Sequence, residues 1–209
     1  MIEVEKQGLL TRIYLNRPER ANALTRKMLS DLREVILSNG QQHALVISGR
    51  GKVFSAGADL NEVKESGLAT APEWEALSKT VSDFPGLSIA ALNGTLAGGA
   101  FGMALACDLR FGVEGMNLFY PVLKNGVMPQ FSDPKRLGQL IGPAKTKALF
   151  LTGQKIDAET ALRWGLIDRV VASNALENLV QKSTEACLKC DSVYFNNLKR
   201  FVRDGLGDF

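Results

Sequence analysis

Two turns made of small residues restrict the fold and function of this chain more than any other feature. The first, residues 54–59, reads Phe-Ser-Ala-Gly-Ala-Asp, and the second, residues 93–100, reads Asn-Gly-Thr-Leu-Ala-Gly-Gly-Ala. Each follows an expected buried strand and leads into an expected helix. Ligands of α/β proteins bind outside the carboxyl ends of such strands, and small side chains let a ligand approach the backbone closely. Together the turns predict a ligand site, whereas either one alone is explained by tight turns and close packing.

Short apolar segments alternate with segments of helical periodicity along much of the chain. This alternation predicts an α/β fold with a largely parallel sheet and helices outside it. We expect one domain over residues 1–209, with a core at 1–140 and a helical C-terminal region at 141–209. The expected strands are residues 2–5, 9–15, 44–49, 88–92 and 109–111, and the expected helices lie around 28–36, 61–66, 100–107, 134–140, 144–151, 158–164 and 176–189.

Charge and hydrophobicity argue against several classes of function. The net charge is +3 and no Lys/Arg cluster stands out, so a nucleic-acid partner is not expected. The longest apolar runs, such as residues 87–92 and 102–107, are too short to cross a bilayer, so no membrane partner is expected. The acidic and polar start of the chain does not resemble a secretory signal, and the expected location is the cytoplasm.

Side chains of the usual catalytic types are scarce. His43 is the single histidine, and it stands at the start of an expected buried strand, where a structural role is favoured. Cys187 and Cys190 form a C-x-x-C pair, but zinc needs two more ligands. We therefore expect no metal site and no Ser-His-Asp or Cys-His chemistry.

The backbone of the two turns is the remaining candidate for chemistry. The N–H groups at the start of the helix expected at residues 100–107 have no partner within that helix and lie at the positive end of its dipole. Two such N–H groups aimed at one oxygen stabilise an enolate or a tetrahedral oxyanion. The turns therefore predict an oxyanion hole.

Five segments of the sequence, in the same order, resemble the signature of the crotonase (enoyl-CoA hydratase/isomerase) superfamily. The resemblance implies an α/β spiral of strand–strand–helix repeats with a helical C-terminal extension. It also implies a homotrimer or a dimer of trimers, assembled through the C-terminal helices. The segments are N-R-P-E-R-A-N-A-L (residues 16–24), F-S-A-G-A-D-L (54–60), I-A-A-L-N-G-T-L-A-G-G (89–99), A-C-D-L-R (106–110) and the stretch 153–171.

The resemblance also implies a ligand and the residues that bind it. By position, Ala56 and Gly99 supply the two N–H groups that hold the carbonyl oxygen of an acyl-CoA thioester. No cofactor is implied beyond coenzyme A as part of the substrate. Arg20 is expected at a phosphate, with a solvated loop charge as the equally weighted alternative. The residues implied at the nucleotide end are Arg20, Ala21, Ala23, Ser55, Ala58, Asp59 and Leu60.

The sequence departs from the family pattern where typical hydratases carry two glutamates. Gly102 and Val122 stand at those positions, and neither side chain can act as an acid or a base. Tyr120 is a candidate proton donor, with an aromatic core residue as the favoured alternative. Lys124 is a candidate base if buried and otherwise a surface charge. Asp133 is a candidate carboxylate, although its position before a proline is more typical of a helix cap.

Three hypotheses about function follow from this combination. The first is an acyl-CoA enzyme that decarboxylates a malonyl-type thioester, because loss of carbon dioxide creates an enolate without a base. The second is an enoyl-CoA hydratase/isomerase whose activity is weak or altered. The third is a non-catalytic acyl-CoA-binding or scaffold protein. Binding of CoA thioesters tests all three, and turnover separates the first two from the third.

Overall fold

Six strands form the larger of two sheets in the computed structural model, which describes residues 1–206. The order is β1-β2-β3-β5-β7-β10; β1 and β2 form an antiparallel hairpin, and the following neighbours pair in parallel. Every residue of β3 is buried, as expected for a parallel strand covered on both faces. The strands are β1 (Ile2–Gln7), β2 (Leu10–Leu15), β3 (Ala44–Gly49), β5 (Leu87–Leu92), β7 (Leu109–Val113) and β10 (Arg169–Val171).

Four short strands form the second sheet, in the order β4-β6-β8-β9. The first three pair in parallel, and β9 pairs with β8 in antiparallel fashion. Along the chain, β3, β5 and β7 of the first sheet are each followed by a strand of the second sheet and then by a helix, which gives the repeating unit of the fold. The strands are β4 (Val53–Ser55), β6 (Thr95–Ala97), β8 (Asn117–Phe119) and β9 (Ile156–Asp157).

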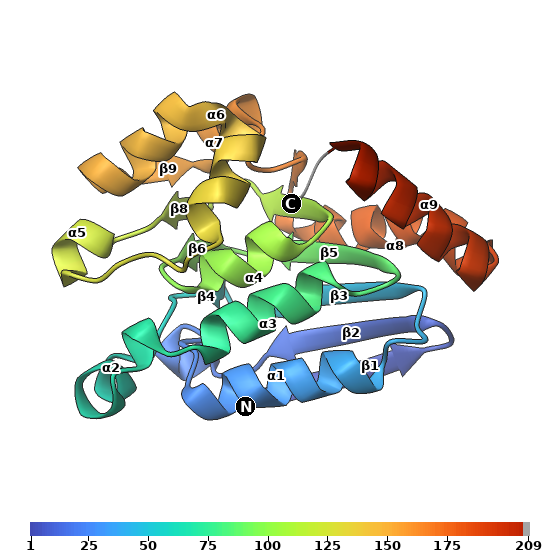
Figure 1. The fold of residues 1–209 in the computed structure, drawn as a ribbon, viewed down its shortest axis with the longest axis horizontal. Coiled ribbons are helices and arrows are strands. Elements are labelled where there is room, and N and C mark those ends of the chain that lie inside the picture. The colour runs from blue at the N-terminus through green and yellow to red at the C-terminus, as the bar shows by residue number, and fades with distance from the viewer. Residues whose placement is uncertain (207–209) are drawn as a thin grey trace.

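Helices α1, α3 and α4 lie side by side and cover one face of the larger sheet (Figure 1). Helix α8 packs against β3, β5 and β7. The helices are α1 (Arg26–Ser38), α2 (Leu60–Ser66), α3 (Glu73–Ser82), α4 (Ala100–Ala106), α5 (Val122–Asn125), α6 (Asp133–Thr152), α7 (Ala158–Trp164), α8 (Leu176–Lys189) and α9 (Ser192–Leu206).

Helix α1 illustrates how the sequence builds this layer. Thr25 caps the helix by accepting a hydrogen bond from the backbone N–H of Met28, at 3.1 Å. Side chains at helical spacing then turn one face inward. Burying each of them stabilises the fold by about 1.5–3 kcal/mol. The buried side chains of α1 are Met28, Leu29, Leu32 and Ile36.

The predicted α/β class and strand–strand–helix repeats are confirmed, and each expected strand and helix is present. The two helices expected on either side of residue 142 form α6, which kinks at Gly142 because that residue has φ +77°. The C-terminal region is not purely helical, since it adds β9 and β10 to the two sheets. Three other strands or short helices (β6, β8 and α5) and two longer helices (α3 and α9) were not expected. Within residues 1–206, no helix combines the length and apolar character needed to cross a membrane.

Candidate functional site

The two small-residue turns lie against each other at one edge of the second sheet. The first turn leaves β4 after Ser55, and the second turn contains β6 and leaves it after Ala97. Because β4 and β6 pair in parallel, both turns leave the sheet on the same side. Gly57 has φ +92°, and a Cβ added to it would lie 2.8 Å from the carbonyl oxygen of Ala97 and 3.3 Å from the nitrogen of Gly99. Only glycine allows this approach without strain. The predicted meeting of the two turns is therefore present in the structure.

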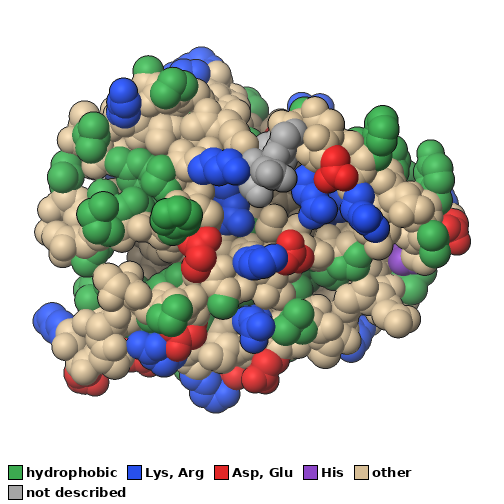
Figure 2. All heavy atoms as spheres, in the orientation of Figure 1, with side chains coloured by type: hydrophobic (Ala, Val, Ile, Leu, Met, Phe, Trp, Pro, Cys, Tyr) green, Lys and Arg blue, Asp and Glu red, His purple; other side chains and the backbone are tan. Residues whose placement is uncertain are grey.

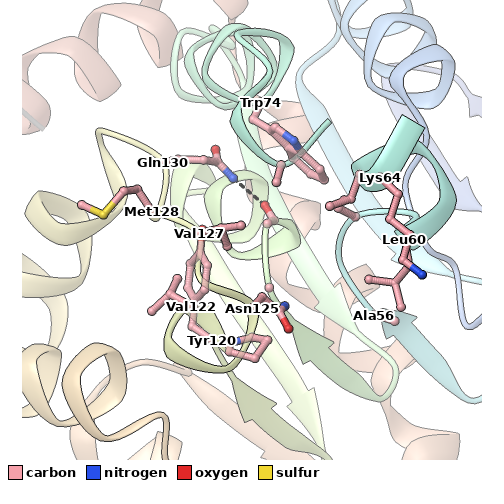
Figure 3. Close-up of a pocket in the computed structure, with 16 residues that line it drawn as sticks. Ala56, Leu60, Lys64, Trp74, Tyr120, Val122, Asn125, Val127, Met128 and Gln130 are labelled. Carbon is pink, nitrogen blue, oxygen red and sulfur yellow. Dashed lines mark hydrogen bonds between the residues drawn. The ribbon is translucent and has the colours of Figure 1, made fainter. Parts of the chain in front are cut away.

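A cavity of about 230 Å³ lies beside the turns (Figure 3). Figure 2 shows the surface hollowed between the α2 and α5 segments, with hydrophobic side chains above the hollow. We call this space the inner cavity. Its lining contains no Asp, Glu or His side chain, so no ionisable acid or imidazole faces it directly. The lining residues are Ala56, Ala58, Leu60, Val63, Lys64, Ala69, Trp74, Gly98, Gly99, Tyr120, Pro121, Val122, Asn125, Val127, Met128 and Gln130.

A second cavity, of about 760 Å³, continues from the first. We call it the outer cavity. Three cationic side chains line it, those of Arg20, Lys124 and Lys155, and none of them forms an ion pair within residues 1–206. Unpaired cations of this kind suit a phosphorylated ligand. The two cavities share the lining residues Ala56, Ala58, Leu60, Pro121 and Asn125.

The structure contradicts the prediction that Ala56 supplies one free N–H group. Its N–H donates to the carbonyl oxygen of Ala21, at 2.9 Å, and is therefore already engaged. Ala58 lines both cavities, and its N–H has no acceptor among the described residues. Ala58 pairs with Leu24 in an isolated parallel bridge. The two hydrogen bonds of this bridge join Leu24 to the carbonyl oxygen of Gly57 and to the N–H of Asp59, so the N–H of Ala58 is not used. The free donor of the first turn is thus Ala58.

Gly99 supplies the free N–H of the second turn. It is the N-cap residue of α4, and its N–H has no acceptor within residues 1–206. The preceding N–H, of Gly98, donates to the carbonyl oxygen of Phe119 at 3.1 Å. The indole ring of Trp74 packs over Gly99, because a Cβ there would lie 3.1 Å from the ring. A side chain at position 99 would therefore require the ring to shift by a few tenths of an ångström.

The residues predicted at the nucleotide end divide into two groups. Ser55 is fully buried, and its hydroxyl donates to the carbonyl oxygen of Asn22, so it does not face a ligand. Ala21 lines neither cavity, and its carbonyl oxygen accepts the hydrogen bond from the N–H of Ala56. For these two residues the structure corrects the prediction. The others line the outer cavity: Arg20, Ala23, Ala58, Asp59 and Leu60.

The carboxylate of Asp59 is already occupied by protein groups. It accepts from Arg17 at 3.0 Å and caps α2 by accepting from the backbone N–H groups of Asn61 and Glu62. Burial alone would raise the pKa of Asp59, but these hydrogen bonds outweigh burial and hold the pKa below its usual range. Asp59 therefore remains ionised near neutral pH and shapes the site through α2.

Tyr120 and Asp133, the two side chains predicted as acid–base candidates, are hydrogen-bonded to each other. The hydroxyl of Tyr120 donates to Asp133 Oδ2 at 2.9 Å, and both residues are buried. Burial is the main cause that raises the pKa of Asp133 to about 7, and burial followed by the charge of Asp133 raises the pKa of Tyr120. Tyr120 lines the inner cavity, whereas Asp133 lies behind it. The tyrosine therefore connects the carboxyl group to the cavity.

The helix-cap interpretation of Asp133 is wrong. Helix α6 begins at Asp133 itself, its N-cap residue is Ser132, and no side chain caps it. The carboxyl group turns toward Tyr120, and its Oδ1 is buried without a partner. Among the charged side chains around Asp133, Arg136 lowers the pKa of the carboxyl group and Glu75 raises it. Contact with a distant residue has thus overridden the local capping pattern.

We expect Asp133→Asn to remove a pH dependence of stability between about pH 4, where an unfolded aspartate titrates, and about pH 7. In this interval the folded wild type holds a proton that the unfolded chain releases, so its unfolding free energy falls as the pH rises. Asparagine still accepts from Tyr120 but does not titrate. Urea unfolding across this interval measures the effect. A difference between wild type and variant that does not change with pH would contradict it.

Gln130 and Trp74 are site residues to which the sequence analysis gave no role. Gln130 lines the inner cavity, and its Nε2 donates to the carbonyl oxygen of Gly99 at 2.6 Å. Trp74 comes from α3, and its Nε1 donates to the carbonyl oxygen of Leu68 at 2.7 Å. The helical spacing of the apolar residues in α3 is a signal that would have placed Trp74 on a buried face.

The remaining candidates for catalytic or metal-binding roles are His43, the cysteines and Lys124. His43 Nδ1 donates to the carbonyl oxygen of Cys187 at 3.0 Å, which fits the predicted structural role. Cys107 is buried, and burial raises the pKa of its thiol to about 12. Lys124 is exposed, so the burial on which its role as a base depended is not present. Within residues 1–206, no group of three His, Cys, Asp or Glu side chains is arranged to hold a metal ion.

Comparison with known proteins agrees with this geometry. The family model described as enoyl-CoA hydratase/isomerase matches residues 5–206. A short-chain-enoyl-CoA hydratase from Clostridium acetobutylicum is 33% identical over 97% of this chain and 81% of its own length. A carnitinyl-CoA dehydratase from Citrobacter koseri is 32% identical over 95% of this chain and 78% of its own.

Solved structures extend the comparison to the whole fold. An enoyl-CoA hydratase from Bacillus anthracis superposes with a TM-score of 0.92 at 28% identity, over 98% of this chain and 83% of that one. The DspI protein of Pseudomonas aeruginosa superposes with a TM-score of 0.91 at 32% identity, over 98% of this chain and 80% of that one. Fold, ordered motifs and family match agree: the chain belongs to the enoyl-CoA hydratase/isomerase family.

Proposed function

We propose that this protein binds an acyl-CoA thioester and stabilises its enolate with two backbone N–H groups. The observation that carries this proposal is the pair of unused donors, on Ala58 and Gly99, at two turns in direct contact beside the inner cavity. A thioester oxygen accepting from both gains charge in the enolate, and fixed donors stabilise that charge. The acyl group occupies the inner cavity, whose walls are mainly apolar.

The coenzyme A portion occupies the outer cavity. Its phosphates are met there by Arg20, Lys124 and Lys155, which have no carboxylate partners among the described residues. The shared lining residues support a position for the thioester at the junction between the two cavities, next to the free N–H groups. This arrangement supports a full CoA ester, rather than a short acyl group alone, as the ligand.

Decarboxylation of a malonyl-type thioester is the reaction that fits best. No carboxylate lines the inner cavity, and Gly102 and Val122 carry no acid or base. In decarboxylation the bond from the α-carbon to the carboxylate breaks, carbon dioxide leaves, and the electron pair forms the enolate on the thioester oxygen. A proton then returns to the α-carbon from the Tyr120 hydroxyl, and the protonated form of Asp133 passes its own proton to the tyrosine oxygen and is reprotonated from solvent. No base is needed to start the reaction.

Turnover of a panel of thioesters tests this proposal. Crotonyl-, malonyl- and methylmalonyl-CoA are incubated with the protein, and mass spectrometry follows loss of carbon dioxide or gain of water. We expect decarboxylation of a malonyl-type ester, and we expect CoA esters to raise the melting temperature more than the matching pantetheine esters. Hydration of crotonyl-CoA without decarboxylation of any malonyl-type ester would overturn the proposed reaction. Failure of every CoA ester to bind would overturn the proposal that the ligand is an acyl-CoA.

A non-catalytic acyl-CoA-binding protein is the second candidate. The absence of any Asp, Glu or His side chain from the lining of the inner cavity favours it. Stabilisation by CoA esters with no turnover of the panel is its expected result.

For either function we propose assembly into a homotrimer or a dimer of trimers, and the exposed apolar side chains of α9 support an assembly. They are Val193, Tyr194, Leu198, Phe201, Val202 and Leu206.

A further inference from the structure

The side chain of Gln130 crosses from the loop before α6 to the first turn of α4. Its Nε2 donates to the carbonyl oxygen of Gly99 at 2.6 Å, and Figure 3 shows this bond at the wall of the inner cavity. A carbonyl oxygen only accepts, so the amide nitrogen has to face Gly99. The amide oxygen therefore points the other way, toward Gly102.

Gln130 occupies the space that a side chain at position 102 would need. A Cβ added to Gly102 would lie 2.1 Å from Gln130 Oε1 and 2.6 Å from its Cδ. The two positions therefore compete for one volume. The absence of a side chain at position 102 is what lets the carboxamide reach Gly99.

The second turn needs such an anchor because it contains two consecutive glycines. Gly98 has φ +55°, and glycine peptides rotate more freely than others. The N–H of Gly98 is fixed by Phe119, and the ring of Trp74 packs over Gly99. The Gly99 carbonyl also accepts from the N–H of Gly102, at a longer 3.3 Å. Gln130 provides a short side-chain contact to the peptide group between Gly99 and Ala100, and so restrains the backbone angles of Gly99 that set the direction of its N–H.

We propose that Gln130 is a positioning residue of the oxyanion hole, which takes the place of a side chain at position 102 and fixes the direction of the Gly99 N–H. This inference rests on the proposed function, since it assumes that Gly99 donates to a thioester oxygen. It assigns Gln130 no proton transfer, because a carboxamide neither gains nor loses a proton near neutral pH.

Infrared spectroscopy of a bound thioester tests the proposal independently of turnover. Butyryl-CoA labelled with carbon-13 at the thioester carbonyl is the probe, because hydrogen bonds to this oxygen lower its stretching frequency. We expect a downward shift on binding to the wild type and a loss of about half of that shift in Gln130→Leu, since one of two donors is misdirected. The wild-type shift retained in Gln130→Leu would overturn the inference.

Gln42→Leu is the matched control. Both Gln130 and Gln42 have a buried amide oxygen without a hydrogen-bond partner among the described residues, but Gln42 lies outside both cavities. We expect this variant to keep the wild-type shift, and a loss equal to that of Gln130→Leu would overturn a specific role for Gln130. If bound butyryl-CoA shows no shift even in the wild type, the proposed oxyanion hole itself fails, which is a separate outcome.

Gly102→Ala tests the shared volume from the other side. Its Cβ displaces the flexible end of Gln130, while alanine suits a helix better than glycine, so the fold is expected to survive. We expect the same reduced shift as in Gln130→Leu. The double variant is expected to lose no more than either single variant, because both changes remove one contact. Additive losses would contradict competition for one volume.

Discussion

Gly99→Pro is expected to lower the turnover number for an accepted acyl-CoA by about 10²- to 10³-fold, the usual cost of removing one oxyanion donor. Proline has no N–H, so the second turn loses its donor while the first, on Ala58, is kept. The backbone of Gly99 has φ −58° and ψ −18°, close to the φ that proline imposes. Steady-state kinetics on the accepted substrate measures the effect.

Gly99→Ala is the matched control for this variant. It adds a Cβ that also meets the Trp74 ring, at 3.1 Å, but it keeps the N–H. The difference between the two variants therefore isolates the hydrogen-bond donor from the steric change. Proline also restricts Gly98, so the melting temperature of each variant is measured alongside the kinetics. Equal rates for the proline and alanine variants would show that the Gly99 N–H does not stabilise the reaction.

The sequence predicted the contact between the two turns but not the donor of the first. Apolar runs that end in small residues were enough to place both turns at one sheet edge. Which N–H points into the cavity depends on the backbone direction at each residue, and Gly57, with φ +92°, turns the chain between Ala56 and Ala58. The result is that Ala56 bonds to Ala21, and Ala58 is left free.

Asp133 shows a second limit of local reasoning. An aspartate before a proline is typical of a helix cap, because short-range contacts usually decide such positions. Here a buried tyrosine hydroxyl, from Tyr120, competes for the carboxyl group and holds it at 2.9 Å. The pairing joins residues 13 positions apart in the chain, across a loop whose path could not be derived from the sequence. Both residues were identified as candidates, but their contact was not.

Helix α3 was overlooked although its pattern is regular. Trp74, Leu77 and Val81 recur at helical spacing and are all buried. No helix was expected between residues 66 and 88, so the part of the inner-cavity lining that Trp74 forms was not predicted. The structure places Trp74 between α3 and the second turn, where it contacts the residue that carries the oxyanion donor. Packing of α3 and geometry of the site are therefore linked through one side chain.

Trp74→Ala is expected to destabilise the protein by about 3–5 kcal/mol, because truncating a buried tryptophan leaves a cavity. Trp74 is 4% exposed, and its Nε1 bonds to the carbonyl oxygen of Leu68 at 2.7 Å. For a chain of this size, we expect the melting temperature to fall by roughly 10 °C. Calorimetry measures the loss.

The ring also limits the movement of the Gly98–Gly99 peptides, so Trp74→Ala should weaken the carbonyl shift of bound butyryl-CoA as well. Trp74→Phe is the control: phenylalanine keeps an aromatic ring in the buried site but loses the hydrogen bond to Leu68 and the outer indole atoms that meet Gly99. We expect it to be less destabilised than the alanine variant and to retain more of the shift than that variant does. If Trp74→Ala lost stability but kept the full wild-type shift, the tryptophan would support the fold without positioning the donor, and the link between α3 and the oxyanion hole would be broken.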